Sequence, residues 1–306
     1  MSLALSVLPL VLIISCGYLL AKTNILPKAD WKGIETLSFR VLIPAVLILA
    51  ITRTDLSFER FGGVMLALIL TWAVLACVAL ALRLLPRAQL GNPAFTSIFQ
   101  IGTRWNAFVA LAAAEQFIGT EGLSVMAVAI ALLIPTINVS CIVVLSAFGP
   151  TNTSLSGVLR IVAKNPLVQA CAAGLLIYFS GLTLPVPIIE TLDMIGRGAL
   201  AVGLLAVGAG ISLRRLTRWD WKVGIGVALR PVIAPCLFVG FAMFIGLNPA
   251  QTLAGVLVFA APAASNGYIV SKQMGGDADL YADTLTWQTI LCLIILPFWA
   301  YVLISI

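Results

Sequence analysis

The fold is decided by residues 250–273, which read AQTLAGVLVFAAPAASNGYIVSKQ. The segment is long enough to cross a bilayer as a helix, which needs about 20 apolar residues. Its middle, however, carries Pro262, Ser265 and Asn266, and proline weakens a helix because it has no backbone N–H. This pattern predicts a membrane-spanning helix that is broken near its centre, where polar groups are costly and usually functional.

The composition of the whole chain also indicates a membrane environment. Of the 306 residues, 61% are hydrophobic and 10% are charged, and the mean hydropathy is +1.10. Soluble domains carry roughly 25% charged residues, so this chain cannot cover a surface that faces water. Continuous apolar runs favour helices over a transmembrane barrel, whose strands alternate polar and apolar residues. Soluble enzymes and nucleic-acid binders are therefore excluded, and no nucleic-acid partner is expected.

Ten apolar segments predict an all-α membrane protein with ten transmembrane helices. They are 4–21, 32–52, 62–84, 94–118, 122–147, 166–182, 187–211, 221–245, 250–273 and 280–305. A polar linker, 148–165, separates five segments from five, so the second half would enter the bilayer in the opposite sense. Two inverted five-helix repeats, 1–147 and 166–306, are typical of secondary transporters.

Weak internal similarity supports this duplication. Ile34-Glu35-Thr36-Leu37 recurs as Ile189-Glu190-Thr191-Leu192, and an arginine follows each copy. Asn106 lies in the middle of the fourth segment, and the ninth segment carries Asn266. The order of these features is the same in both halves, as a duplication requires.

The distribution of Lys and Arg predicts the orientation in the membrane. With the N-terminus outside, the outer connections carry only Arg53 and Arg60. The inner connections then carry Lys22, Lys28, Lys32, Arg83, Arg87, Arg160, Lys164, Arg214, Arg215, Arg218, Lys222 and Lys272. Because positive loops stay inside, both termini are predicted to lie outside, and linker 148–165 is predicted to be cytoplasmic.

Enzymatic motifs are absent from the sequence. There is no His, which removes His-based metal sites, Ser–His catalysis and His proton relays. The six Cys lie in apolar runs, where they are typical packing residues. No glycine-rich phosphate loop with Lys is present, so an ATP-driven pump is unsupported. We expect no enzyme activity, no cofactor and no bound metal.

Two corresponding segments concentrate the polar residues that would lie inside the bilayer. Residues 100–108 read QIGTRWNAF, and residues 261–268 read APAASNGY. Gly102 in the first run and Pro262 with Gly267 in the second weaken the helix. Helices broken at paired positions of two repeats indicate a transporter site, because the freed helix N-termini attract anions. A proline kink filled by neighbouring helices is the alternative.

Other intramembrane polar residues allow two interpretations each. Arg104 either attracts an anion or pairs bidentately with a substrate carboxylate, or it has no such role and pairs with Glu115 or snorkels to an interface. Asn138 either lines the same cavity or bonds to a neighbouring helix. Three further arginines lie within predicted spans, where a structural role is favoured: Arg40, Arg197 and Arg230. Arg197 is expected to pair with Asp193, which lies one helical turn earlier.

Several of these runs resemble the auxin efflux carrier family. The run Pro262–Tyr268, continued by Gly275-Gly276-Asp277, looks like the ninth-span signature of that family. Further similar runs are Arg104–Phe108 with Glu121-Gly122-Leu123, Leu133–Pro135 with Asn138, and Val207–Gly210 ahead of Leu213. The resemblance covers essentially the whole chain. In one departure, Ala112, Ala113 and Ala114 stand where the family usually has a proline, so Gly102 and Asn106 would have to break the fourth span.

The resemblance implies a fold similar to that of bile-acid sodium symporters. Residues 1–60 and 166–215 would form a scaffold, and residues 61–147 and 221–306 a transport domain that moves as an elevator. The fourth and ninth spans would cross at the bilayer midplane. Plant members export the auxin anion, and prokaryotic members are associated with malonate and other organic acids. Without the large central loop of long plant members, the chain resembles prokaryotic members, which implies the inner (plasma) membrane.

The leading hypothesis is a secondary active transporter that exports small organic anions. Asn106 and Asn266 would bind the substrate carboxylate, Ser265 and Tyr268 would assist, and Arg104 would supply positive potential. A sodium-coupled uptake symporter is the main alternative, and a passive channel is less favoured. The loops are too short for the output domain of a receptor.

The coupling ion and the oligomeric state stay open at this point. Sodium could bind to oxygen atoms around the fourth and ninth spans, and Glu115 is the acidic residue nearest to them in sequence that could carry a proton. The scaffold implied by the resemblance could also support a homodimer.

Overall fold

The computed structural model describes residues 3–53, 58–86, 90–149 and 155–304. Almost all of these residues are helical, and no strand occurs among them. The predicted all-α class is therefore confirmed for the described part of the chain.

The helices of the first half include two that follow one another closely, α5 and α6. The elements are α1 (Leu3–Lys22), α2 (Lys28–Leu37), η1 (Ser38–Leu42), α3 (Ile43–Arg53), α4 (Phe58–Ala81), η2 (Leu82–Leu84), α5 (Asn92–Thr103), α6 (Ala107–Phe117) and α7 (Thr120–Phe148).

The second half begins with a short helix inside the predicted linker. Its elements are α8 (Leu155–Ala163), α9 (Pro166–Ser180), α10 (Val186–Gly210), η3 (Leu213–Thr217), α11 (Trp221–Val227), η4 (Ala228–Ile233), α12 (Ala234–Ile245), α13 (Pro249–Ala260), α14 (Asn266–Met274) and α15 (Ala278–Ile304). The remainder of the linker, residues 150–154, lies outside the described residues.

Six helical stretches among the described residues are long and apolar enough to cross a membrane. They are Ala29–Arg53, Phe58–Leu84, Thr120–Phe148, Val186–Gly210, Trp221–Ile245 and Ala278–Ile304. The other predicted segments hold shorter apolar helices, among them α9 and α13, and two of them are divided into pairs, α5 with α6 and α13 with α14. The chain is thus a multi-pass membrane protein.

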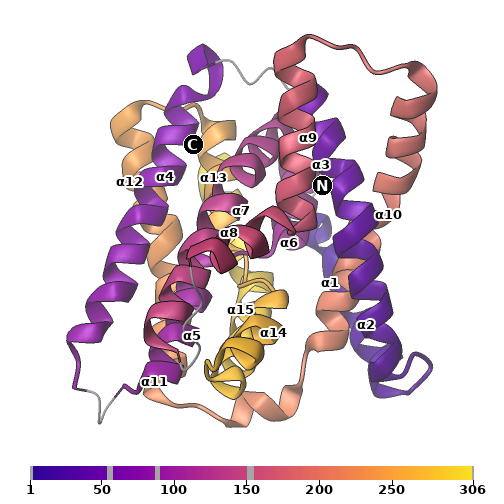
Figure 1. The fold of residues 1–306 in the computed structure, drawn as a ribbon. Coiled ribbons are helices and arrows are strands. Elements are labelled where there is room, and N and C mark those ends of the chain that lie inside the picture. Colours follow the sequence, from indigo (N-terminus) through magenta and orange to yellow (C-terminus); the bar gives the residue numbers. More distant parts are fainter. Residues whose placement is uncertain (1–2, 54–57, 87–89, 150–154, 305–306) are drawn as a thin grey trace.

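The helices form two groups that lie side by side (Figure 1). In one group α1 packs along α10, and α3 packs against α9 and α10. In the other, α4, α12, α13 and α7 pack together and α15 packs against α13. The contact of α1 with α10 depends on glycine, because a Cβ on Gly208 would lie 1.9 Å from the carbonyl oxygen of Ile14.

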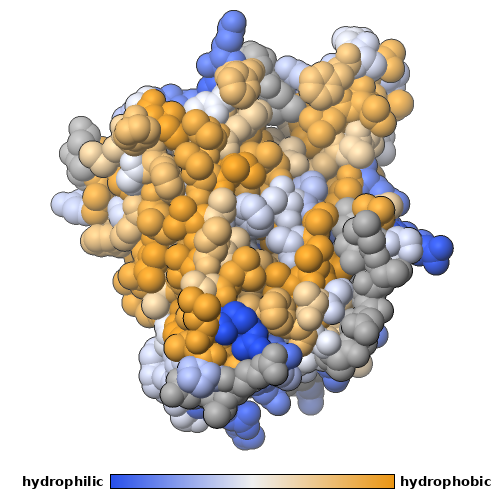
Figure 2. Space-filling view, turned by 60° about the vertical axis from the view of Figure 1, so that its left-hand side comes forward, coloured by the Kyte–Doolittle hydropathy of each residue, from blue (hydrophilic) through white to orange (hydrophobic). Residues whose placement is uncertain are grey.

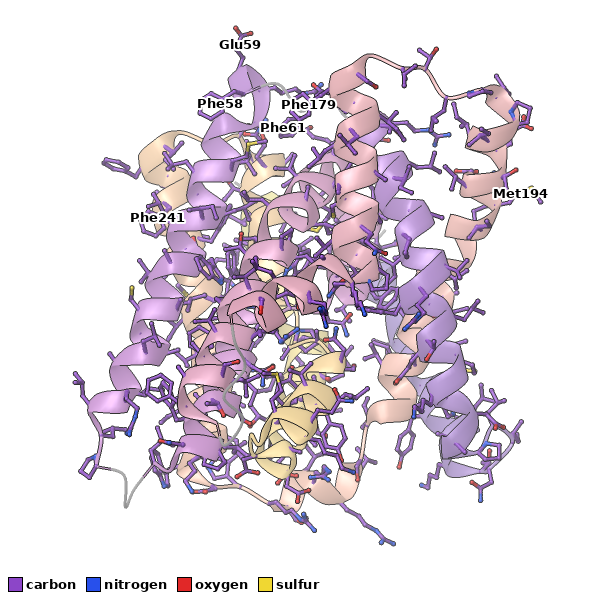
Figure 3. All side chains as sticks on the ribbon, viewed as in Figure 1. Phe58, Glu59, Phe61, Phe179, Met194 and Phe241 are labelled. Carbon is purple, nitrogen blue, oxygen red and sulfur yellow. The ribbon has the colours of Figure 1, made fainter. Side chains whose placement is uncertain are left out.

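The outer surface is suited to lipid. Figure 2 shows a face that is mostly apolar, with most hydrophilic residues toward its ends. Large apolar side chains project outward, and the exposed fractions of Phe179 and Met194 are 78% and 74% (Figure 3). Such exposure would be costly in water but is favourable against acyl chains.

Two long helices contain a π-helical turn that carries an arginine. Arg40 lies in η1 and is exposed, whereas Arg230 lies in η4 and is fully buried. A π-helical turn inserts an extra residue into a helix and often marks a functional site. Of these two turns, η4 points its arginine into the protein.

Candidate functional site

The first interruption separates α5 from α6 at residues 104–106. Arg104 and Asn106 have extended backbone conformations, and the Asn106 side chain caps α6. Its Oδ1 accepts hydrogen bonds from the backbone N–H groups of Phe108 and Val109 at 3.1 and 3.3 Å. Asparagine is among the best N-cap residues, because its side chain satisfies N–H groups that have no partner within the helix. Beyond the cap, α6 runs continuously through Ala112, Ala113 and Ala114.

The second interruption separates α13 from α14 at residues 261–265. Pro262 explains it in two ways. The residue before a proline avoids the helical conformation, and Ala261 is extended, with ψ of 147°. Pro262 also has no N–H, so the carbonyl oxygen of Val258 loses the donor that a continuous helix would give it.

The two interruptions touch each other. The backbone N–H of Asn106 donates to the carbonyl oxygen of Pro262 at 2.8 Å. In an unbroken helix that N–H would bond to Gly102, so the contact between the breaks frees the Gly102 carbonyl. The N–H of Ala263 donates to the side chain of Gln288 at 2.8 Å, which ties the second interruption to α15. Figure 1 shows α13 and α14 end to end, with their junction near mid-height.

Arg230 binds the carbonyl groups that the interruptions set free. Its Nη2 donates to Val258 at 2.8 Å and its Nε to Ala261 at 3.1 Å. Its Nη1 donates to both Gly102 and Thr103 at 3.3 Å. One guanidinium therefore serves the C-terminal ends of α13 and α5 together. A buried carbonyl without a donor costs about 1–3 kcal/mol, so this residue is essential to the geometry of the breaks.

Arg104 is held by amide side chains. Its Nε donates to Gln100 and its Nη1 to Asn138 on α7, both at 3.1 Å. Gln100 in turn donates to Ser271 on α14 at 2.8 Å. The alternative pairing with Glu115 is wrong, because Glu115 is exposed in the last turn of α6. Asn138 therefore bonds to a neighbouring helix and positions Arg104.

The buried arginines carry charge that no carboxylate neutralises. Within the described part of the chain, neither Arg104 nor Arg230 forms an ion pair, although they are only 5% and 0% exposed. The N-termini of α6 and α14 add about half a positive charge each. The carbonyl ends of α5 and α13 offset the charge of Arg230, so Arg104 and the two helix N-termini supply the positive potential that favours an anion.

Residues of the second interruption keep unused hydrogen-bonding capacity. The Oδ1 atom of Asn266 is buried without a partner, and Ser265 forms no side-chain cap for α14. Ser265, Asn266 and Tyr268 are all partly exposed. The hydroxyl of Tyr281 donates to the carbonyl oxygen of Ala264 at 2.6 Å. Gly267 packs against the same hydroxyl, because a Cβ on Gly267 would lie 2.1 Å from its oxygen atom.

A second charged cluster lies at the start of α15. Arg215 of η3 pairs with Asp279 and Asp283. Burial lowers the pKa of Arg215, but the hydrogen bonds and charges of Asp283 and Asp279 outweigh it and raise the pKa overall. Elsewhere, Arg197 pairs with Asp193 as predicted, but it is exposed. No group of three acidic or Cys side chains that could hold a metal ion occurs in the described ranges.

Sequence reasoning missed two contributors to this site. Arg230 was expected to be merely structural, like Arg40 and Arg197, and nothing in its own segment distinguishes it from them. Gln288 went unnoticed, although it lies mid-segment in an apolar run and bonds to both Ala263 and Gly226. The rule that polar residues inside the bilayer are candidates would have found it.

The second half of the chain is similar to a family of membrane transport proteins. Residues 150–300 match the family described as "Membrane transport protein". Over this second half of the chain, the match confirms the resemblance to auxin efflux carriers.

One curated relative is similar to part of this chain. A "Putative malonate transporter" from Rhizobium meliloti (strain 1021) is 25% identical over 136 residues. The match covers 44% of this chain and 42% of the relative, so the chain aligns with less than half of that protein's length.

Proposed function

We propose that the protein is a secondary active transporter of small organic anions, with its substrate site where the two helix interruptions meet. The observation that carries this proposal is the buried Arg104, which has no carboxylate partner among the described residues and lies beside the N-terminus of α6, where the two interruptions meet. The family match and the name of the malonate transporter relative support the same substrate class.

Each proposed site residue has a specific role toward a carboxylate. The Oδ1 of Asn106 caps α6, which leaves its NH₂ group to donate to an anion. The Oδ1 of Asn266 has no partner among the described residues, and its NH₂ group can donate to an anion; Ser265 and Tyr268 can donate from their hydroxyl groups. Arg104 supplies positive potential and is oriented by Asn138. Gly102, Pro262 and Gly267 keep the two helices broken.

The proposed mechanism is elevator-type alternating access that exports the anion. Ten spans in two inverted five-helix repeats would provide a scaffold from 1–60 and 166–215 and a moving domain from 61–147 and 221–306. The two helix groups of Figure 1 support this division. We also propose a prokaryotic inner-membrane location, both termini outside and a homodimer through the scaffold.

Binding to the purified protein gives the first test. Malonate should raise the unfolding temperature by an amount that saturates, because a ligand that binds only the folded state stabilises it. The same measurement with acetate, succinate and an aromatic acid shows which class of carboxylate stabilises the protein most, and choline serves as a cationic control. If no carboxylate raised the unfolding temperature, the anion site would be contradicted.

Counterflow distinguishes the carrier from the passive channel. Proteoliposomes loaded with unlabelled malonate should accumulate labelled malonate transiently, and the rate should saturate. A flux that rises linearly with concentration and shows no counterflow would indicate a channel instead.

A further inference from the structure

The strongest feature outside the proposed anion site is the set of four carbonyl oxygen atoms around Arg230. They come from the last turns of two half-helices, Gly102 and Thr103 from α5 and Val258 and Ala261 from the end of α13. In transporters with broken helices, carbonyl groups at half-helix C-terminal ends are the groups that coordinate a coupling sodium ion. Here the same kind of cradle holds a guanidinium.

The charges of this arrangement match. Each helix C-terminus carries about half a negative charge, so the ends of α5 and α13 together supply about one unit. One guanidinium supplies one positive charge and stays protonated in proteins. The face of Phe259 lies 5.8 Å from the guanidinium carbon, which adds a favourable cation–π contact. A further cation at this position would be repelled.

The guanidinium suits the site better than an ammonium would. Its donors lie in a fixed planar fork, and its three nitrogen atoms reach four carbonyls at 2.8–3.3 Å. Lysine has a single nitrogen with three donors, so it could serve only part of this set. The π-helical turn η4 places Arg230 at this depth.

We infer that Arg230 is a built-in cation that occupies the position of a coupling sodium ion, so that transport proceeds without sodium. The meaning of the site for coupling rests on the proposed function, but the cation cradle can be tested without any substrate. The inference excludes the sodium-coupled symporter, which is one of the carrier types that the sequence leaves open.

The test removes the resident cation and asks whether sodium replaces it. Arg230→Met deletes the charge and keeps much of the side-chain volume, and Arg230→Lys keeps the charge. Arg197→Met is the matched control, because Arg197 is an exposed arginine on α10 far from the cradle in sequence. The unfolding temperature of each purified protein is measured as NaCl replaces N-methylglucamine chloride at constant ionic strength.

The expected result is specific to one variant. Arg230→Met unfolds at lower temperature than the wild type, and NaCl raises its unfolding temperature by about 3 °C with saturation. The wild type, Arg230→Lys and Arg197→Met show no sodium-specific change. If Arg230 were only structural, Arg230→Met would lower the unfolding temperature, but sodium would not restore it.

Three results would overturn the inference. The first is a saturable effect of sodium on the unfolding temperature of the wild type. The second is an Arg230→Met protein as stable as the wild type. The third is an Arg230→Met protein that is destabilised but whose unfolding temperature does not change with sodium. If Arg230→Met does not fold, the wild type and Arg230→Lys decide, since a sodium-specific rise in either contradicts the inference and insensitivity of both supports it. Malonate binding is measured separately, so loss of the proposed function would leave this result intact.

Discussion

The two helix interruptions use the same architecture but differ in how their polar groups are satisfied. At the first, Asn106 is 4% exposed and caps α6, and Arg104 is bonded to two amides. At the second, Asn266 has an unpartnered oxygen atom and Ser265 caps nothing. The difference teaches that the first break is fixed by internal bonds, whereas the second retains hydrogen-bonding capacity for a ligand.

A shift of one residue explains this difference. Asn106 precedes the first residue of α6, so its side chain can reach back to the helix N–H groups. Asn266 is itself the first residue of α14, with Ser265 in the preceding position. The two asparagines look equivalent in sequence, but only Asn106 occupies the capping position.

The largest expected effect belongs to Asn266→Ala. This variant should bind malonate at least about tenfold more weakly, which corresponds to about 1.4 kcal/mol. Its free energy of unfolding should stay equal to or exceed that of the wild type, because the substitution removes a buried acceptor that has no partner. Titration calorimetry and thermal unfolding measure the two quantities. Wild-type affinity in this variant would remove Asn266 from the site.

Asn106→Ala should affect stability as well as binding. Loss of the cap should cost about 1 kcal/mol of stability, or about 2–4 °C in unfolding temperature. Malonate affinity should fall by less than in Asn266→Ala. Asn106→Ser, which can still cap α6, should restore the stability but not the affinity. If serine restored neither, the capping role would be refuted.

Arg104→Gln should weaken malonate binding by a smaller factor, about threefold to fivefold, since Arg104 acts through potential rather than contact. The variant's affinity should also depend less on salt concentration than that of the wild type. Arg104→Lys, which keeps the charge, serves as the control. An unchanged salt dependence in Arg104→Gln would contradict the electrostatic role.

The smallest effect is expected for Ser265→Ala. An N-cap substitution typically costs about 1 kcal/mol, but Ser265 forms no cap, so its stability should change by less than about 0.5 kcal/mol. Malonate affinity should fall about twofold to threefold, through the loss of a neutral donor. A stability loss as large as that of Asn106→Ala would show that the two interruptions are capped alike.

Local chemistry determined which parts could be predicted from the sequence. The all-α membrane class follows from apolar runs, and the proline at position 262 acts on its own neighbours, Val258 and Ala261. The role of Arg230 could not be predicted, because two of its carbonyl partners lie more than 120 residues away. Arg40 and Arg197 also lie in predicted spans, yet both are exposed.

The candidate site shows the same limit. Asn106 and Asn266 were identified as a pair from their positions in the two halves, but their different hydrogen bonds depend on where each helix begins. Glu115 was close to the site in sequence, yet nine residues of helix carry it roughly 14 Å along the axis from Asn106. Its role as a possible coupling residue stays a prediction.

The most direct test of the central claim is a structure of the protein with malonate bound. A carboxylate should lie between the start of α6 and the start of α14, within about 3 Å of a side-chain atom of Asn266. Malonate bound elsewhere, with the space between the two helix starts closed, would contradict a substrate site at the meeting of the two interruptions.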